Sequence, residues 1–301
     1  MQQQAELVID ARHATGESPV WHCGEQALFG VDIPARQLWR WQPGNDKSKS
    51  AMTTWMAPEM IGCIAQTAHP GRWLAGLESG IFELQTNGSA LQSRCLAAVE
   101  HAVSGMRFND GRCDRQGRFW AGTMLMNMSL ASPVGALYRY AETGLQKILD
   151  GFITPNGLGF SPGGRTMYLS DSHPIVQTIW AFDYDVQTGT PSRRRVFVDM
   201  NVFPGRPDGA AVDADGCYWI CANDAGLIHR FTPAGKLDQS LVVPVKKPAM
   251  CAFGGADLDT LFVTSIRPDG VDLSDQPLAG GVFALRPGVR GLPEPVFSLP
   301  N

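Results

Sequence analysis

The sequence predicts an all-β fold, namely a six-bladed β-propeller whose four-stranded blades surround a central channel in a single domain, residues 1–301. Glycine and proline, 33 and 21 residues respectively, are spread along the chain as is typical of many short strands joined by turns. Six similar apolar segments recur at intervals of 43 to 51 residues, and a period of about 40–50 residues indicates propeller blades. The alternative all-β fold, a large β-sandwich, does not explain this even spacing.

Each repeat supplies the strands of one blade. The six recurring segments, most of which follow a turn rich in Gly, Asp or Pro, are 27–32, 73–77, 119–123, 167–171, 218–222 and 261–265. A second apolar segment follows each of them, in most cases with the alternation of a strand packed on one face: 37–41, 80–84, 136–140, 179–183, 227–231 and 281–285. Outer strands are expected at 94–99, 146–150, 194–200 and 241–245, and the strand before each turn completes the set of four.

Either terminal segment can close the ring. Residues 6–10 stand before Gly16-Glu17-Ser18 much as residues 196–199 stand before Arg206-Pro207-Asp208. By this analogy we expect the N-terminal strand to join the last blade, which removes the unpaired edges that closed sheets avoid. Residues 294–298 compete for the same place, and the sequence does not decide between them.

Composition excludes several classes of partner. The chain has 25 Lys and Arg against 29 Asp and Glu, a net charge of −4, which argues against nucleic acid or an anionic membrane surface as the main partner. The most apolar stretch, residues 60–68, is well short of the ~20 residues of a membrane span. Seven scattered cysteines without a C-x-x-C motif indicate reduced thiols. Because Met1–Gln4 also lacks the features of a signal peptide, we expect a cytoplasmic protein.

One position of the repeat carries a set of polar side chains. Ten residues before each recurring segment, or eleven in the fourth repeat, stand Glu17, Cys63, Asn109, Asn156, Asp208 and Cys251. Equivalent positions in a propeller lie at the same height around the channel, where each innermost strand begins. Two ionised carboxylates there need a cation. Oxygen ligands favour one divalent ion, Ca²⁺, Mg²⁺ or Mn²⁺, with Zn²⁺ also possible. For any single residue the alternative is an ordinary turn cap.

Other motifs do not support a function. Residues 159–163 match G-x-S-x-G, but Pro162 and two glycines follow Ser161 where a nucleophile elbow needs a helix. Residues 157–159 resemble part of a dinucleotide loop, again without a following helix. The six histidines show no metal-ligand spacing, and only His173, at a strand end near the predicted channel mouth, is a candidate for function.

The motifs together resemble the regucalcin/gluconolactonase family, which includes luciferin-regenerating-enzyme-like propellers. They are found at 16–21, 107–111, 121–124, 155–158, 207–209, 247–248, 251–255 and 261–265, in the family's order along the whole chain. The resemblance implies a six-bladed propeller that binds one divalent metal and opens sugar lactones to aldonic acids. It implies that Glu17, Asn156 and Asp208 are metal ligands, that Asp208 is also the general base, and that Arg107 and Asn109 bind substrate.

One substrate position departs from the family's pattern. Animal members carry a glutamate three residues after their G-T-M motif, where this chain has Asn127. The intervening Leu125 and Met126 are apolar, so we expect Asn127 to contact a substrate that differs from that of the animal proteins. The expected function is metal-dependent lactone hydrolysis, with the metal polarising the carbonyl. The alternatives are a phosphotriesterase or aryl-esterase-like hydrolase and a non-enzymatic calcium-binding propeller.

Overall fold

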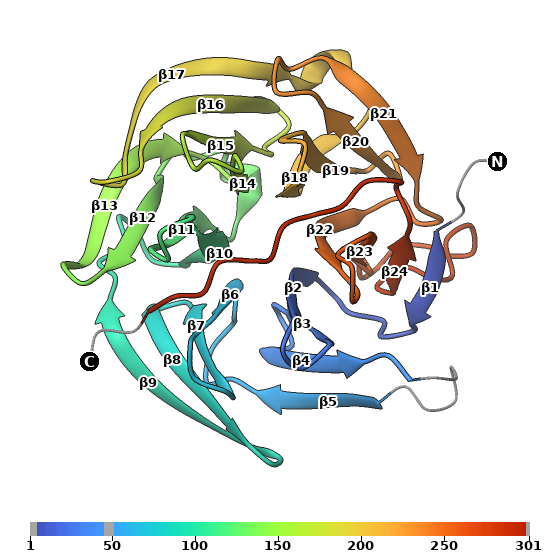
Figure 1. The fold of residues 1–301 in the computed structure, drawn as a ribbon, viewed down its shortest axis with the longest axis horizontal. Helices are drawn as coiled ribbons and strands as arrows, with labels where there is room; N and C mark the ends of the chain where they lie inside the picture. The colour runs from blue at the N-terminus through green and yellow to red at the C-terminus, as the bar shows by residue number, and fades with distance from the viewer. Residues whose placement is uncertain (1–4, 45–50, 299–301) are drawn as a thin grey trace.

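The computed structural model describes residues 5–44 and 51–298 as six four-stranded antiparallel sheets arranged around one axis (Figure 1). This confirms the predicted six-bladed β-propeller. Within these two ranges no helix has the length and apolar character needed to cross a membrane. Met1–Gln4, on which the expectation of a cytoplasmic protein partly depends, lies outside the described residues.

The first three blades follow the chain directly, from the innermost to the outermost strand. Blade 1 contains β2 (Gly16–His22), β3 (Ala27–Asp32), β4 (Gln37–Gln42) and β5 (Ala51–Met56). Blade 2 contains β6 (Cys63–Gln66), β7 (Arg72–Gly76), β8 (Gly80–Asn87) and β9 (Ala90–Ala98). Blade 3 contains β10 (Met106–Cys113), β11 (Phe119–Leu125), β12 (Gly135–Ala141) and β13 (Gly144–Phe152), with the 3-10 helix η2 (Met128–Leu130) between β11 and β12.

The next two blades repeat this order. Blade 4 contains β14 (Pro155–Phe160), β15 (Thr166–Asp171), β16 (Thr178–Asp185) and β17 (Thr190–Asp199), and the 3-10 helix η3 (Met200–Val202) follows it. Blade 5 contains β18 (Arg206–Val212), β19 (Tyr218–Asn223), β20 (Leu227–Phe231) and β21 (Leu237–Val242). The outer strand expected at 241–245 therefore begins earlier, because the pairing of β21 with β20 extends back to Leu237, opposite Phe231.

Blade 6 combines the two ends of the chain. It contains β22 (Pro248–Gly254), β23 (Thr260–Ser265) and β24 (Val282–Leu285), and β1 (Glu6–Ile9) is its outer strand. β1 pairs antiparallel with β24, with Leu7 opposite Phe283. The N-terminal strand thus completes a sheet whose other three strands come from the opposite end of the chain.

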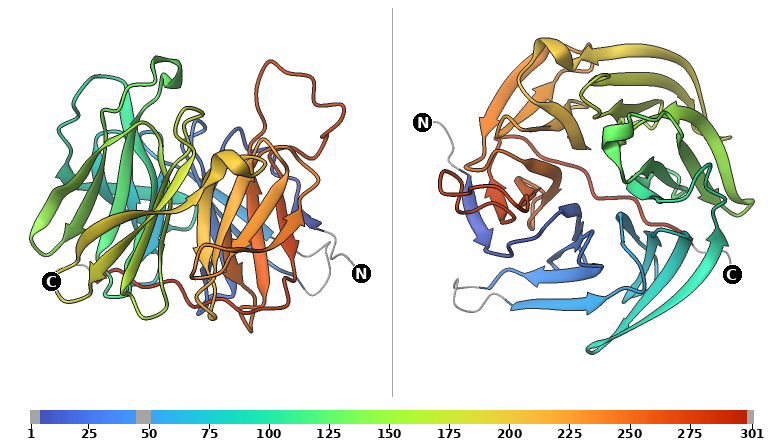
Figure 2. Two further views of the ribbon diagram at one scale, coloured as in Figure 1. Left: turned by 90° about the horizontal axis from the view of Figure 1, so that it is seen from above. Right: turned by 180° about the vertical axis from the view of Figure 1, so that it is seen from behind.

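The C-terminal segment takes a different path. Residues 286–298, here called the tail, leave β24 and cross the end of the channel opposite the long loops (Figures 1 and 2). Gly291 forms a bridge with Asp213 of blade 5, and Phe297 forms one with Thr67 of blade 2. Between these points, the carboxylate of Glu294 lies 3.7 Å from the Arg112 guanidinium.

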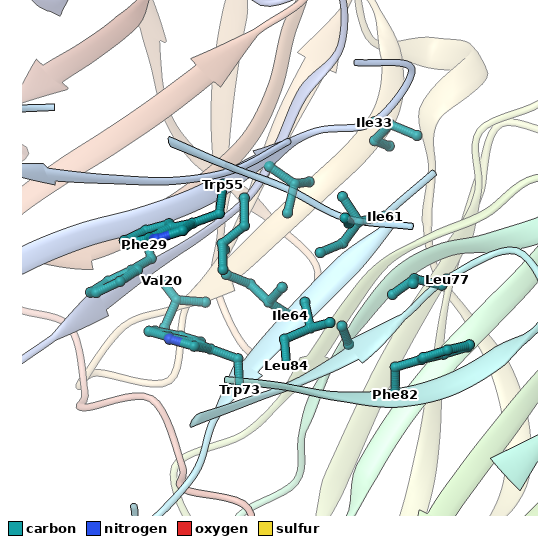
Figure 3. Packing of buried hydrophobic residues seen from close by; sticks show 14 of the residues in the cluster. Val20, Phe29, Ile33, Trp55, Ile61, Ile64, Trp73, Leu77, Phe82 and Leu84 are labelled. Atoms are coloured by element: carbon teal, nitrogen blue, oxygen red, sulfur yellow. The ribbon is translucent and has the colours of Figure 1, made fainter. Parts of the chain in front are cut away.

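The cores lie between neighbouring blades. Blades 1 and 2 enclose one cluster, in which Phe29 and Trp73 have ring centroids 4.3 Å apart and Ile64 and Leu84 fill the adjacent space (Figure 3). Burying one such Phe or Leu side chain contributes about 1.5–3 kcal/mol to stability. Packing within a blade also needs small residues, since a Cβ on Gly30 of β3 would lie 2.2 Å from the ring of Trp39, its pairing partner on β4. The packed blades form a rigid frame for the innermost strands.

Candidate metal and active site

The four oxygen-bearing side chains among the six repeat positions lie at one end of the channel. Glu17, Asn109, Asn156 and Asp208 are on β2, β10, β14 and β18, the innermost strands of blades 1, 3, 4 and 5. Asn109 donates from Nδ2 to Asn156 Oδ1 at 3.0 Å, and Asn156 donates from Nδ2 to Asp208 Oδ1 at 2.8 Å. These three side chains therefore form a continuous chain of hydrogen bonds across three blades. The channel end is on the face from which the 126–134 and 266–281 loops project (Figure 2, left).

The pairing of the innermost strands is irregular at these side chains. Ladder pairing is interrupted between Glu17 and Val20, between Asn156 and Gly159, and at the corresponding places in β10 and β18. Such bulges bend a strand and redirect a side chain, and they occur often beside active sites. Gly157, immediately after Asn156, has a φ of +60°, which a glycine adopts without steric cost.

Burial dominates the electrostatics of the two carboxylates. It raises the pKa of Glu17 well above its usual range, and the charges of Asp208 and Asp110 add to the increase. Burial also raises the pKa of Asp208 to about 7, although the hydrogen bond from Asn223 acts in the opposite direction. Two negative charges are therefore costly here without a compensating cation.

The predicted substrate residues fall into two groups. Arg107 lies beside the cluster and donates from one terminal nitrogen to Asn109 Oδ1 and to the Phe108 carbonyl oxygen, both at 2.8 Å. Burial lowers the pKa of Arg107, and the charge of Glu17 opposes this effect. Asn127 is instead exposed on the rim loop after β11, where its Oδ1 accepts a hydrogen bond from Ser129 at 2.6 Å. Its contact with substrate remains a prediction.

The two cysteines at the same repeat position do not extend the polar set. Cys63 and Cys251 are fully buried in apolar clusters. Burial raises the pKa of the Cys63 thiol, which keeps it protonated and a poor metal ligand. The polar side chains of this ring consequently come from four blades.

Sequence reasoning missed two residues that touch this cluster. Asn223, the last residue of β19, donates from Nδ2 to Asp208 Oδ2 at 2.6 Å. Ser172, directly after β15, accepts a hydrogen bond on Oγ from Asn156 Nδ2 at 2.5 Å. Both are polar residues at the end of an apolar strand, a signal that could have been noticed. His173 follows Ser172 and joins two rim loops, since its Nε2 lies 3.1 Å from the Met128 carbonyl oxygen.

The donor set fits a hard divalent cation. Among residues 5–44 and 51–298, no group of three or more His, Cys, Asp or Glu side chains is arranged to hold a metal ion. Glu17 and Asp208 supply two carboxylates, and Asn156 supplies an amide that hydrogen-bonds to Asp208. A cation between them would offset the cost of burying both charges, and an all-oxygen set suits Ca²⁺ or Mg²⁺.

Comparisons with known proteins find relatives along the whole chain. A family model described as "SMP-30/Gluconolactonase/LRE-like region" matches residues 15–267. The chain is 38% identical to the 6-deoxy-6-sulfogluconolactonase of Pseudomonas putida, over 99% of this chain and 100% of the relative. It is 36% identical to regucalcin of Sus scrofa, over 96% of each chain. A solved structure described as a calcium-binding protein, regucalcin, from Agrobacterium tumefaciens superposes with a TM-score of 0.90, 27% identity and 99% coverage of each chain.

Proposed function

Because the chain belongs to the SMP-30/gluconolactonase/LRE-like family, we propose that it is a sugar lactonase, which hydrolyses the cyclic ester of an aldonic acid. The observation that carries this proposal is the hydrogen-bonded row of Asn109, Asn156 and Asp208 at the channel end, with Arg107 beside it. Two relatives described above are named as a lactonase and as regucalcin, and the row supplies the groups that ester hydrolysis needs.

We propose that Glu17, Asn156 and Asp208 hold one divalent metal ion. When bound, the ion would supply Lewis acidity to the lactone carbonyl. Glu17 has no cationic hydrogen-bond partner among the described contacts, and its one bond comes from the Ser18 backbone N–H at 3.4 Å. This supports a role in holding a cation. The candidate ions are Ca²⁺, Mg²⁺, Mn²⁺ and Zn²⁺.

Asp208 is the proposed general base. Its carboxylate would accept a proton from the water that attacks the carbonyl carbon, and the ring oxygen would leave with a proton to give the hydroxy acid. Burial raises the pKa of Asp208 to about 7, so its carboxylate is a stronger base than one at the surface. A bound cation lowers this pKa, and the reactivity of the lactone ester compensates for the weaker base.

Arg107 and Asn109 are proposed to orient the sugar. Arg107 is held by Asn109 Oδ1 and by the Phe108 carbonyl, which leaves other guanidinium N–H groups for sugar hydroxyls. Fixing these hydroxyls orients the carbonyl without any proton transfer. Asn127 and the apolar side chains around it are proposed to set the substrate preference at the rim. The Pseudomonas putida relative is named for a sulfonated lactone, so sulfonated substrates belong among those to be compared.

The test is a pH-drop assay of chelator-treated protein. Five- and six-carbon aldonolactones and 6-deoxy-6-sulfogluconolactone are compared with a phosphotriester and an aryl acetate, and Ca²⁺, Mg²⁺, Mn²⁺ and Zn²⁺ are added back separately. We expect turnover of at least one lactone that depends on added metal, with loss of turnover in Asp208→Asn and loss of metal in Glu17→Ala. Full activity of the metal-stripped protein contradicts the metal site. Activity confined to the phosphotriester or aryl acetate favours the esterase alternative. Metal binding that raises the melting temperature without any turnover favours a non-enzymatic calcium-binding propeller.

A further inference from the structure

Asp208 accepts a hydrogen bond from Asn223, a residue that is not at the repeat position. Asn223 ends β19, the second strand of the same blade, and its side chain is only 3% exposed. Its Nδ2 lies 2.6 Å from Asp208 Oδ2 and 3.5 Å from the Pro248 carbonyl oxygen. Asn156 holds the other carboxylate oxygen at 2.8 Å. Each oxygen of Asp208 thus receives an amide donor, and the plane of the carboxylate is fixed.

Two cations determine which way the Asn223 amide faces. Its Oδ1 lies 3.5 Å from Lys247 Nζ and 3.4 Å from a terminal nitrogen of Arg206. Lysine and arginine can only donate hydrogen bonds, so the amide oxygen must face them and the NH₂ group must face Asp208. The reverse orientation would place the amide oxygen against the Asp208 carboxylate and the NH₂ group against two cations.

Asp224 holds these two cations together. Arg206 Nε donates to Asp224 Oδ2 at 2.6 Å, and Lys247 Nζ is paired with Asp224 Oδ1. Arg206 also donates to the Ser172 carbonyl oxygen at 3.2 Å, which connects the cluster to blade 4. Because the Arg206 and Lys247 side chains are 22% and 28% exposed, the cluster lies at the rim, while the amide it orients lies inside.

We propose that Asn223 is a positioning residue for the Asp208 carboxylate, and that Arg206, Asp224 and Lys247 fix the orientation of its amide. This rests on the proposed function, in which Asp208 binds the metal and accepts a proton. Partners behind a metal ligand orient it, and their loss typically costs about 10- to 100-fold in metal affinity or activity. We therefore expect Asn223, at the end of β19, to contribute to the metal affinity and turnover of the site although it is not on an innermost strand.

The test compares Asn223→Ala with a matched control. Asn201→Ala also removes an amide that donates to a carboxylate, that of Asp199 at 2.8 Å, but on the exposed surface. We expect Asn223→Ala to lower kcat on the best lactone by about 10- to 100-fold with KM within about threefold. Its affinity for calcium chloride, measured by calorimetry on chelator-treated protein, should fall by about tenfold or more. Asn201→Ala should match the wild type in both measurements.

The outer cluster has its own prediction. Lys247→Met leaves the Asn223 side chain in place but removes one of the cations that orient it, and we expect a kcat loss of about three- to tenfold, smaller than that of Asn223→Ala. This variant changes a partly exposed side chain, so it also serves if Asn223→Ala unfolds.

A double-variant comparison separates positioning from a general structural effect. In an Asp208→Asn background, adding Asn223→Ala should cause no further loss of calcium affinity, because interacting residues are not additive. Wild-type kcat and wild-type calcium affinity in both Asn223→Ala and Lys247→Met overturn the inference, as does an additive loss in the double variant. Absence of lactone turnover in the wild-type protein overturns the proposed function instead, and the calcium measurements still decide the role of Asn223.

Discussion

Replacing Asp208 by Asn should stabilise the metal-free protein. Asp208 is 7% exposed, and its pKa in the folded protein is about 7 against an ordinary value of 3.8. At 1.36 kcal/mol per pKa unit, ionised Asp208 destabilises the metal-free fold by about 4 kcal/mol. Asparagine has one acceptor oxygen where aspartate has two, so either Asn156 or Asn223 loses its acceptor at a cost of about 1 kcal/mol. The net gain at pH 8 is therefore about 3 kcal/mol.

The gain should depend on pH with a definite sign. Because folding raises the pKa of Asp208, the folded protein binds more protons than the unfolded chain between about pH 4 and pH 7. The destabilisation is complete above about pH 7 and is absent below about pH 4. At pH 5 about 3 of the 4 kcal/mol have disappeared, and the advantage of Asp208→Asn should fall to about zero.

Thermal unfolding in a chelator measures this effect. With an unfolding entropy of about 2.1 cal/mol/K per residue, 3 kcal/mol in a chain of this length raises the melting temperature by about 5 °C. We expect this difference at pH 8 and almost none at pH 5. Millimolar calcium chloride should then stabilise the wild type more than the variant. A chelated Asp208→Asn protein that melts at or below the wild-type temperature at pH 8 would refute the conclusion that ionised Asp208 destabilises the metal-free fold.

Three further substitutions test substrate binding, the backbone conformation at Gly157 and the contact of the tail with Arg112. Arg107→Met should raise the KM for the lactone about tenfold and leave kcat within about twofold, because it removes a contact to the sugar hydroxyls that the bound substrate already makes; an unchanged KM in steady-state assays contradicts its role in binding the sugar. Gly157→Ala adds a Cβ 2.5 Å from the Tyr218 hydroxyl at a φ of +60°, so denaturant titration should show a loss of about 2 kcal/mol or more, and a wild-type midpoint counts against strain. Glu294→Gln removes the carboxylate 3.7 Å from Arg112 and should cost about 1–2 kcal/mol in thermal unfolding with normal kcat; lost turnover with normal stability argues for a different role.

The architecture could be predicted because its signal repeats. A single apolar segment such as 218–222 does not show whether it is a strand or a buried helix. Six such segments at an even spacing indicate a repeated structural unit that stacks on its neighbours. The same regularity predicted which residues share a height around the channel, and Asn109, Asn156 and Asp208 are joined by hydrogen bonds as a result. The outer strand β21 was predicted four residues too late, because its pairing with β20 is exposed on one side and leaves a weaker apolar signal.

Contacts made by residues outside the repeat position could not be predicted in the same way. Asn223 lies outside the repeat position, and it meets Asp208 only because β19 pairs with β18 and ends at the same height. Arg206 and Lys247 reach Asp224 from different blades, and nothing in their local sequence indicates a partner. For Asn127 the motif predicts a contact with substrate, but the motif does not predict the conformation of the loop. In the structure the Asn127 side chain is hydrogen-bonded to Ser129 of the same loop.

The path of the tail has a consequence for how the molecule is assembled. Ordinary blade packing connects only adjacent blades, but the bridges at Asp213 and Thr67 tie blade 5 to blade 2 across the diameter. The ring of blades is also closed by β1, which can pair only after β24 has been synthesised. Both contacts need β24 or the tail. Until these residues have been synthesised, the earlier blades can form only an open arc. The slowest part of folding is then the joining of the two ends, which are the most distant in sequence.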